Sequence, residues 1–213
     1  MTNRQRGLFI TLEGGEGTGK STQIRLMEES LRKKGIDILL TREPGGSPAA
    51  EEIRNILLSG SGEKWDSISE VLLFSAARRN HLTEVIWPAL KQGTWVISDR
   101  FADSTMAYQG YGRADNLLKK EDIQSLYRLI AGDFEPDLTI LLDIEPEKGL
   151  LRVKSRGDEN RLDKMDLSFH HNLRNAFLDI ARENPNRFCV IDASQSIEFV
   201  HKEIMTYVEE RFK

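Results

Sequence analysis

The feature that most constrains this chain is a glycine-rich segment near its start, Gly14-Gly15-Glu16-Gly17-Thr18-Gly19-Lys20-Ser21. A short apolar run, Leu8–Leu12, precedes it, and a helical pattern from Lys20 to Lys34 follows it. A glycine, four residues and then Gly-Lys-Ser between a strand and a helix is the pattern of a phosphate-binding loop. Glycines let the backbone wrap around phosphates, and the start of the helix adds unpaired N–H groups. The segment therefore predicts a site for a nucleoside triphosphate.

Two side chains of this loop have a specific expected task. Lys20 should reach the β- and γ-phosphates, and the Ser21 hydroxyl should bind Mg²⁺. A nucleoside triphosphate with Mg²⁺ is the expected ligand of the loop. The predicted ATP-binding residues are Gly14, Gly15, Glu16, Gly17, Thr18, Gly19, Lys20, Ser21 and Thr22.

Short apolar runs alternate with longer amphipathic stretches along the whole chain. The runs are Leu8–Leu12, Ile36–Thr41, Trp95–Ser98, Leu138–Asp143 and Phe188–Ile191. They are nearly continuous in apolar residues, as strands buried on both faces should be. The helical patterns are Lys20–Lys34, Ala49–Leu58, Ser69–Gln92, Lys120–Ala131, Pro146–Lys154, Lys164–Glu183 and Ile197–Arg211. This alternation predicts an α/β fold with a parallel five-stranded sheet and helices on both faces, and ligands beyond the carboxyl ends of the strands.

Length and composition narrow the class of protein. The 213 residues contain no repeat and no linker rich in Gly, Pro or Ser, so we expect one domain over 1–213. The net charge of −4 argues against a protein that coats nucleic acid. No apolar stretch reaches the ~18 residues of a membrane span, and the polar N-terminus carries no secretion signal. A single cysteine, Cys189, excludes an internal disulfide. These features predict a cytoplasmic protein that binds neither nucleic acid nor membranes.

An acidic and a basic residue, Asp99-Arg100, follow the apolar run Trp95–Ser98. A carboxylate at the end of a strand is where a P-loop enzyme places the acid that helps hold Mg²⁺. We therefore expect Ser21 and Asp99 to bind the metal. An ordinary surface ion pair is the alternative interpretation of the two residues.

Phosphoryl transfer needs more positive charge than Lys20 and Mg²⁺ supply. The loop itself contains no arginine, so the charge must come from elsewhere in the chain. The basic, glycine-broken stretch Arg152–Arg161 has the composition of a flap that closes over the triphosphate, within about residues 150–165. A solvated corner between two helices remains the alternative.

Three further stretches are unusual: Thr41-Arg42-Glu43-Pro44-Gly45-Gly46-Ser47, Leu73-Phe74-Ser75-Ala76-Ala77-Arg78, and Asp99-Arg100-Phe101-Ala102-Asp103-Ser104-Thr105-Met106-Ala107-Tyr108-Gln109-Gly110. With them the chain strongly resembles the thymidylate kinase family, the dTMP kinases, from the P-loop to Ile191-Asp192-Ala193-Ser194. The combination of Arg-Glu-Pro-Gly-Gly with Asp-Arg-Phe-x-x-Ser-x-x-Ala-Tyr-Gln-Gly is very specific. The resemblance implies a kinase that phosphorylates dTMP to dTDP with ATP.

The resemblance also implies how the thymine base is held. The residue matching Phe74 stacks on the ring, and the arginine matching Arg78, one turn further along, donates to a thymine carbonyl. Gln109 matches a residue that faces the base edge, and Tyr108 matches one that packs near the sugar. Phe74 on its helical spacing alone would be read as a core residue.

For the acceptor phosphate, the family's arginines match Arg54 and Arg100, with Arg42 as a further candidate. The acidic residue matching Glu16 lies between the sugar and phosphate groups, and the serine matching Ser104 completes the expected dTMP site. Arginine suits this task because its planar fork matches phosphate oxygens.

Some members of the family carry the catalytic arginine in the P-loop and others carry it in the lid. Gly17 occupies the place of the loop arginine, so this chain resembles the lid-arginine kind. Arg156 and Arg161 are then the expected lid catalysts, ahead of Arg152. With Lys20 and Arg100 they form the predicted catalytic set.

Two alternatives to a dTMP kinase stay open at this point. One is a kinase for another nucleoside monophosphate, and the other is a P-loop regulator that binds nucleotides without transferring phosphate. Relatives form homodimers through helices beside the sheet, and we expect a homodimer here, for which the Ser69–Gln92 pattern is a candidate surface.

Overall fold

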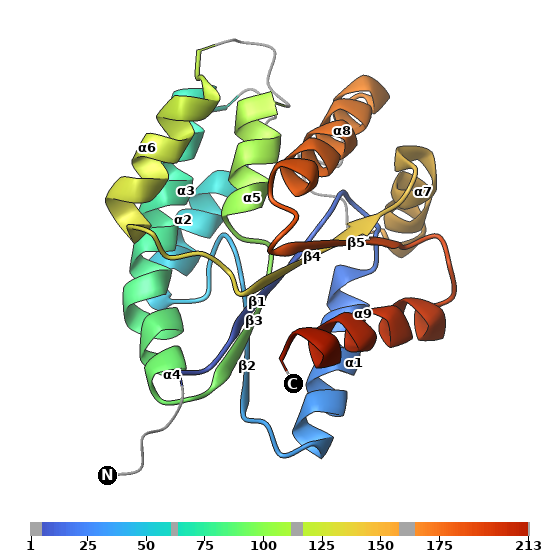
Figure 1. Ribbon diagram of the computed structural model, residues 1–213. Helices are drawn as coiled ribbons and strands as arrows, with labels where there is room; N and C mark the ends of the chain where they lie inside the picture. Colours follow the sequence, from blue (N-terminus) through green and yellow to red (C-terminus); the bar gives the residue numbers. More distant parts are fainter. Residues whose placement is uncertain (1–5, 61–63, 112–116, 158–164, 213) are drawn as a thin grey trace.

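The computed structural model describes residues 6–60, 64–111, 117–157 and 165–212. Its centre is a five-stranded, all-parallel sheet in the order β2-β3-β1-β4-β5 (Figure 1). The strands are β1 (Phe9–Glu13), β2 (Ile38–Arg42), β3 (Trp95–Asp99), β4 (Leu138–Asp143) and β5 (Phe188–Asp192). The predicted α/β fold with five parallel strands is confirmed.

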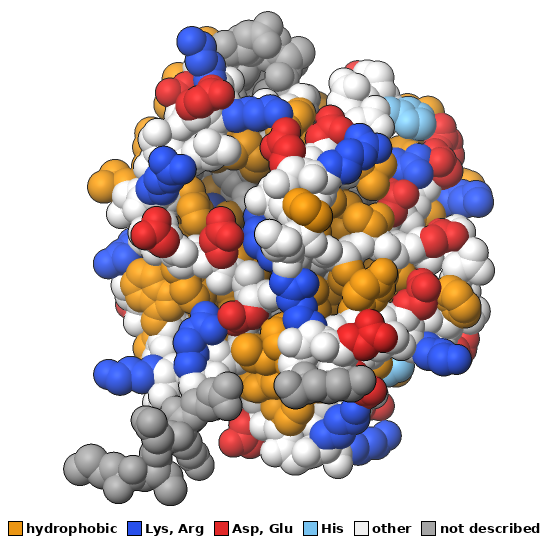
Figure 2. Space-filling view, in the orientation of Figure 1, with side chains coloured by type: hydrophobic (Ala, Val, Ile, Leu, Met, Phe, Trp, Pro, Cys, Tyr) orange, Lys and Arg blue, Asp and Glu red, His pale blue; other side chains and the backbone are white. Residues whose placement is uncertain are grey.

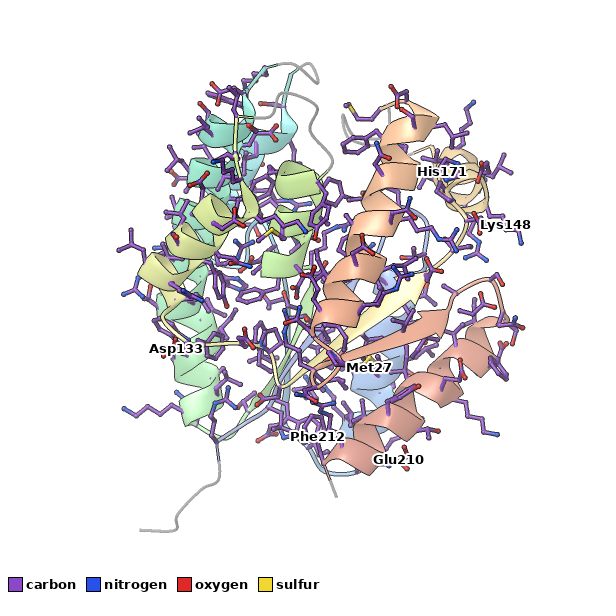
Figure 3. All side chains as sticks on the ribbon, turned by 45° about the horizontal axis from the view of Figure 1, so that its top comes forward. Met27, Asp133, Lys148, His171, Glu210 and Phe212 are labelled. Atoms are coloured by element: carbon purple, nitrogen blue, oxygen red, sulfur yellow. The ribbon has the colours of Figure 1, made fainter. Side chains whose placement is uncertain are left out.

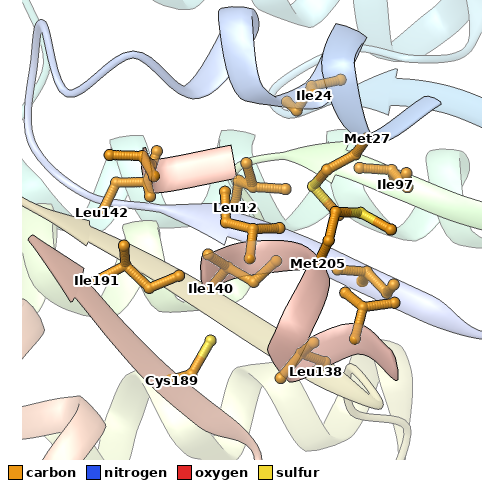
Figure 4. Close-up of a cluster of buried hydrophobic side chains, with 14 of the residues drawn as sticks. Leu12, Ile24, Met27, Ile97, Leu138, Ile140, Leu142, Cys189, Ile191 and Met205 are labelled. Carbon is orange, nitrogen blue, oxygen red and sulfur yellow. The ribbon is translucent and has the colours of Figure 1, made fainter. Parts of the chain in front are cut away.

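One face of the sheet is covered by the first and last helices, α1 (Lys20–Lys33) and α9 (Ile197–Arg211). Leu12, Ile97 and Ile140 point from three strands into this layer, where Met27 of α1 and Met205 of α9 meet them (Figure 4). These strand residues are fully buried. This layer is the largest apolar cluster of the described chain and fixes the position of α1 behind the P-loop.

The other face is less uniformly apolar. It packs against α3 (Ser67–His81), the short α4 (Trp87–Lys91), α6 (Lys120–Ala131) and α8 (Leu167–Glu183). Phe9 and Val96 lie in this layer, but Thr11 and Glu13 alternate with the apolar residues of β1 and face the same way. The Thr11 hydroxyl donates to Thr139 Oγ1 at 3.0 Å. Polar groups are thus buried on the side where the motif loops gather.

The predicted helix Ser69–Gln92 is one continuous helical rod with a change of winding. It consists of α3, a π-helical turn η1 (Leu82–Ile86) and α4. It begins two residues early, at Ser67, because the Asp66 carboxylate caps it by accepting from Ser69 N–H at 2.7 Å. The predicted helical pattern Lys20–Lys34 is confirmed to within one residue, since α1 ends at Lys33 and Gly35 has φ 79°.

The remaining helices agree with the expected patterns within a few residues. They are α2 (Pro48–Leu58) and α7 (Pro146–Arg156), followed in sequence by α8. A short helix α5 (Ala102–Thr105) and a π-helical segment η2 (Met106–Tyr111) follow β3. None of the helices that the structure describes is long and apolar enough to cross a membrane.

The parallel strands all end at the same edge of the sheet, which is why motifs far apart in sequence meet there. β1 leads into the P-loop, β2 into the Arg42–Ser47 loop and β3 into Asp99-Arg100. β3 pairs with both β1 and β2, so Asp99 lies beside Leu12 on one side and Arg42 on the other. This edge carries the candidate site.

Candidate active site

The P-loop connects β1 to α1 through a backbone that only glycine adopts easily. Gly17 has φ 68°, in the left-handed region. A Cβ atom on Gly17 would lie 2.0 Å from the carbonyl oxygen of Gly149, in α7. A Cβ on Gly149 would in turn lie 2.3 Å from the Glu16 carbonyl oxygen. The two glycines therefore let the loop and α7 pack backbone against backbone.

Lys20 lies across the inside of this loop. Its ammonium donates to the carbonyl oxygens of Gly14 at 3.1 Å and Gly15 at 2.9 Å. The side chain is buried. Burial lowers the pKa of its ammonium most, and the positive charge of the nearby Arg100 lowers it further. The Thr18 hydroxyl donates to the Gly15 carbonyl, and Thr22 lies exposed at the start of α1. The predicted loop residues are thus placed around one concave turn.

Ser21 and Asp99 come together as predicted, because α1 begins beside the end of β3. The Ser21 hydroxyl donates to Asp99 Oδ2 at 3.1 Å. Within the described parts of the chain, no three His, Cys, Asp or Glu side chains cluster as a metal site. One hydroxyl and one carboxylate still fit Mg²⁺, which keeps several waters and relies on substrate phosphates for the rest of its shell. Both groups supply hard oxygen ligands.

Arg100 joins the P-loop to the helix that follows β3. One amino group donates to the Gly14 carbonyl at 2.9 Å and to Ser104 Oγ at 3.1 Å, and the other donates to Glu16 Oε1 at 2.8 Å. The Tyr108 hydroxyl donates to the same Glu16 oxygen at 2.5 Å. Five predicted site residues therefore form one hydrogen-bonded group.

The charges in this group depend on one another. Burial would raise the pKa of Glu16, but Arg100 and Lys20 outweigh it and lower that pKa to about 2. Burial would lower the pKa of Arg100, but Tyr108, Glu16 and Asp99 raise it above its ordinary value. Glu16 is therefore a carboxylate and Arg100 a cation at neutral pH. The group presents a fixed positive charge beside a fixed negative one.

Glu13 is a functional candidate that sequence reasoning missed. It ends β1 fully buried, and its carboxylate accepts from Phe101 N–H at 2.7 Å and from the Ser104 hydroxyl at 2.5 Å. It thus holds two residues that follow Arg100 in the chain. Burial and the neighbouring Asp103 raise the pKa of Glu13 to about 8. The only signal in the sequence is an acidic residue closing an apolar strand.

A cleft of about 250 Å³ opens beside the P-loop. Every residue predicted to hold dTMP lines it, and these residues come from the P-loop, β2, α2, α3, the turn after β3, α5 and η2. These residues are Glu16, Arg42, Arg54, Phe74, Arg78, Arg100, Ser104, Tyr108 and Gln109. The same cleft is lined by Lys20, Ser21 and Asp99. Donor-side and acceptor-side residues therefore share one space.

Three arginines converge at one end of the cleft. Arg42 donates to both carboxylate oxygens of Glu51, at 3.0 and 3.1 Å, and Arg54 donates to the Pro44 carbonyl at 2.7 Å. Burial lowers the pKa of Arg54 most. The positive charges of Arg42 and, to a smaller extent, Arg100 lower this pKa further. Mutual repulsion among three cations would be relieved by a bound anion.

The opposite end of the cleft is shaped for a flat, polar-edged ring. Phe74 is half-buried on α3, and Arg78 follows one turn later with its side chain 3 % exposed. Gln109 on η2 donates from Nε2 to Glu70 Oε2 at 3.0 Å. Its Oε1 is buried without a hydrogen-bond partner among the described residues. Gln109 therefore keeps an acceptor, and sequence reasoning missed Glu70 as the residue that orients it.

The lid prediction falls largely outside the described residues. Arg161 lies in the segment 158–164, which the structure does not describe, and the side chain of Arg156 is not described either. Arg174 of α8 donates to both oxygens of Asp143, the last residue of β4, at 2.7 and 2.9 Å, and pairs with Glu145 at the start of α7. Figure 3 shows α7 beside α8, where His171 Nε2 lies 3.0 Å from the Glu147 carboxylate.

Arg152 lies on α7, as expected. Its side chain reaches back to the P-loop, where Nη1 donates to the Gly17 carbonyl at 3.3 Å. The same nitrogen donates to the Ala193 carbonyl, in the loop after β5, at 3.2 Å. Arg152 therefore joins the P-loop to the loop after β5.

A phosphate-binding loop, a hydroxyl–carboxylate pair beside it and arginines that line the same cleft define a P-loop enzyme of the nucleotide kinase class. Comparisons with known proteins agree. The sequence model of the thymidylate kinase family matches residues 12–204. The chain belongs to the thymidylate kinase family.

Individual relatives are similar over nearly their whole length. A thymidylate kinase of Magnetococcus marinus is 50% identical over 208 residues, covering 97% of this chain and 98% of the relative. One of Afipia carboxidovorans is 49% identical, covering 97% of this chain and 90% of the relative. The crystal structure of thymidylate kinase from Ehrlichia chaffeensis has a TM-score of 0.77 at 38% identity, and the match covers 96% and 99% of the two chains.

Replacing Glu13 by Gln should change how stability depends on pH. The unfolded carboxyl loses its proton near its ordinary pKa of 4.5, whereas the folded one keeps it until about 8. Its stabilising contribution is therefore complete below about pH 4.5 and is lost as the pH rises to 8. Wild type should lose at least about 1 kcal/mol relative to Glu13→Gln between pH 5 and 8, measured by urea unfolding. Parallel pH curves for the two proteins would contradict this assignment.

Proposed function

We propose that this chain transfers the γ-phosphoryl group of ATP to the 5′-phosphate of dTMP, giving dTDP and ADP. The observation that carries the proposal is the shared cleft, in which the P-loop side chains and the predicted dTMP residues meet at Arg100 and Glu16. Family membership supports the same reaction. Much of the catalysis is positioning and charge neutralisation, since the attacking phosphate is already an anion.

On the donor side, the ATP phosphates lie in the loop Gly14–Ser21, with Thr22 at the start of α1. The backbone N–H groups of the loop and the start of α1 hold the β-phosphate. Lys20 exchanges its bonds to the Gly14 and Gly15 carbonyls for the β- and γ-phosphates. Its burial means that it binds as a charge in a site of low dielectric, where such an interaction is strong.

Ser21 and Asp99 are the proposed Mg²⁺ ligands, because their oxygens already lie 3.1 Å apart beside the loop. A bound Mg²⁺ would neutralise charge on the β- and γ-phosphates. The protein's own part is to place one hydroxyl and one carboxylate on two rigid elements, α1 and β3.

On the acceptor side, Arg42, Arg54 and Arg100 are proposed to hold the phosphate of dTMP. Their convergence supplies positive charge where the attacking oxygens must lie. Glu16 is held between Arg100 and Tyr108, so it is placed to accept from the sugar side of the nucleotide. Ser104 bonds to Arg100 and steadies it.

The hydrogen-bond donors and acceptors at the base end of the cleft favour thymine over cytosine. Phe74 offers a ring for stacking. Arg78 can only donate, which suits the O4 acceptor of thymine and opposes the N4 amino group of cytosine. The remaining acceptor of Gln109 suits the N3–H of thymine, whereas cytosine carries no hydrogen at N3. Tyr108 is proposed to pack near the sugar.

The lid arginines Arg156 and Arg161 are proposed to complete the charge on the moving phosphoryl group, within a single domain over 1–213. The close contact of Gly17 with α7 supports this, because the P-loop holds no arginine there.

We propose the cytoplasm as the location, since the donor ATP is abundant there.

Steady-state ADP release tests the reaction and its acceptor. With ATP and Mg²⁺, wild type should release ADP only when an acceptor is present. The value of kcat/KM for dTMP should exceed that for dCMP by at least about 10²-fold, because a donor facing the cytosine amino group leaves buried polar groups unpaired. A preference for GMP or CMP would replace the thymine assignment. ADP release that ignores the acceptor, or none at all, would favour a nucleotide-binding protein that is not a kinase.

Replacing Arg100 by Ala should lower kcat/KM by at least about 10²-fold, because a charge that contacts both halves of the site is removed. The matched control is Arg79→Ala, on the exposed side of α3, which should keep near-normal turnover. Circular dichroism checks that both variants fold. Near-normal turnover of Arg100→Ala would overturn the acceptor assignment.

We also propose a homodimer formed through helices beside the sheet. Large apolar side chains are exposed on neighbouring helices: Ile56 on α2, Ile68 and Leu72 on α3, and Leu129, 79 % exposed, on α6. Figure 2 shows apolar side chains among charged ones over α6, at the left of that view. Exposed apolar groups of this kind mark interaction surfaces when they lie together.

Sedimentation velocity tests the dimer. Wild type should sediment with twice the mass of one chain, and Leu72→Asp should shift it toward the monomer, because a buried, unpaired charge is costly in an interface. Leu151→Asp, an equally drastic change at an exposed position of α7, should leave the mass unchanged. A monomeric wild type would end the proposal.

A further inference from the structure

Glu43, in the Thr41–Ser47 loop, is a buried charge that the proposed reaction does not use. Its side chain is 3 % exposed and lies between two helical residues of α3. Oε2 accepts from Arg78 Nε at 2.7 Å, and Oε1 lies 3.0 Å from His81 Nδ1. Burying a charged carboxylate is costly unless it is paired and hydrogen-bonded on both oxygens, as it is here.

His81 extends this contact to the edge strand β2. Because a carboxylate only accepts, the ring nitrogen Nδ1 must donate to Glu43, which assigns the hydrogen to Nδ1. The Nε2 atom of the same ring lies 2.6 Å from the Thr41 hydroxyl oxygen, at hydrogen-bond distance. The ring is fully buried. A chain of hydrogen bonds therefore runs from Thr41 through His81 and Glu43 to Arg78.

Gly46 packs directly against His81 and Thr41 in this chain of hydrogen bonds. It has φ 87°, and a Cβ atom there would lie 2.3 Å from His81 Nε2 and 2.5 Å from Thr41 Oγ1. The glycine loop thus rests directly on the bond between those two side chains. The close backbone cover keeps water from competing for it, and a hydrogen bond in such a site is stronger than one in water.

The Arg78 guanidinium is held on three sides. Nε donates to Glu43, and Nη2 donates to the Phe101 carbonyl at 3.2 Å and to Thr105 Oγ1 at 2.9 Å. Its carbon lies 5.2 Å from the centre of the Phe101 ring. Among the residues that the structure describes, Nη1 donates to no hydrogen-bond acceptor, and Arg78 lines the cleft. A planar guanidinium fixed through its other two nitrogens has one direction left in which Nη1 can donate.

We propose that Glu43 is a positioning residue for base selection: with His81 and Thr41, it holds Arg78 so that Nη1 faces the base. This inference rests on the proposed function. The anchored donor sets the preference for a pyrimidine with an oxygen at position 4 over one with an amino group. A mobile arginine would turn away from the amino group, so loss of the anchor lowers discrimination as well as affinity.

The test replaces Glu43 by Gln, which keeps the shape but removes the charge and one acceptor. The Gln amide cannot accept from Arg78 and His81 on separate oxygens. The KM for dTMP should rise about ten- to hundredfold, with kcat at saturation within about threefold. The ratio of kcat/KM for dTMP over dCMP should fall about tenfold, and the KM for ATP should stay unchanged. The matched control is Glu52→Gln, on the exposed side of α2.

Two further variants separate positioning from folding. Adding Glu43→Gln to Arg78→Ala should produce no further change in the dTMP over dCMP ratio, because both changes act through the same donor. Thr41→Val, which removes only the hydroxyl at the far end of the chain, should change the KM in the same direction by less. Thr41→Val tests the same inference if the Glu43→Gln protein does not fold.

The results that would overturn the inference are distinct from those that would end the proposed function. The inference would be overturned if Glu43→Gln left both the KM for dTMP and the dTMP over dCMP ratio unchanged. If Glu43→Gln does not fold, the same result in Thr41→Val would overturn it. So would additive effects in the double variant, or a loss of kcat alone. The proposed function itself would fail at an earlier step. In that case the wild-type protein would show no turnover that depends on dTMP.

Discussion

The site depends on the conformation of one residue, Arg100. Its φ of 69° lies in the left-handed region, which costs a non-glycine residue roughly 1–2 kcal/mol. The surrounding structure imposes it: Arg100 N–H donates to the Leu12 carbonyl at 3.0 Å, and the Arg100 carbonyl accepts from the Ser98 hydroxyl at 2.7 Å. Glu13 holds the next peptide. This turn sends the guanidinium back toward the P-loop, so the donor and acceptor halves share a cation.

Much of this site follows from sequence because a parallel sheet brings the ends of its strands together. Lys20 begins α1, Asp99 ends β3 and Arg100 directly follows it, so their convergence follows from the fold class alone. Phe74 and Arg78 needed the family resemblance, since their spacing on a helix is equally that of a core residue and a surface cation. All five line the same cleft.

The carboxylates that support the site were not predictable in this way. Glu13 bonds to a residue 91 positions away, and Glu43 bonds to Arg78, 35 positions away. In the sequence each is an acidic residue at the end of a strand, where exposed side chains are ordinary. Only the tertiary structure shows that they are buried. The π-helical segment that carries Gln109 is hidden for a related reason, because its apolar pattern fits an α-helix equally well.

The contact between Gly17 and Gly149 has an evolutionary consequence. The loop backbone and α7 already touch, so a side chain at position 17 and the present place of α7 are mutually exclusive. The family resemblance places the loop arginine of other members at position 17. An arginine at this position would bring its Cβ atom within 2.0 Å of the Gly149 carbonyl oxygen, so α7 would have to move to admit it. A loop arginine and the present packing of α7 therefore exclude each other, and exchanging one for the other requires a change in both segments.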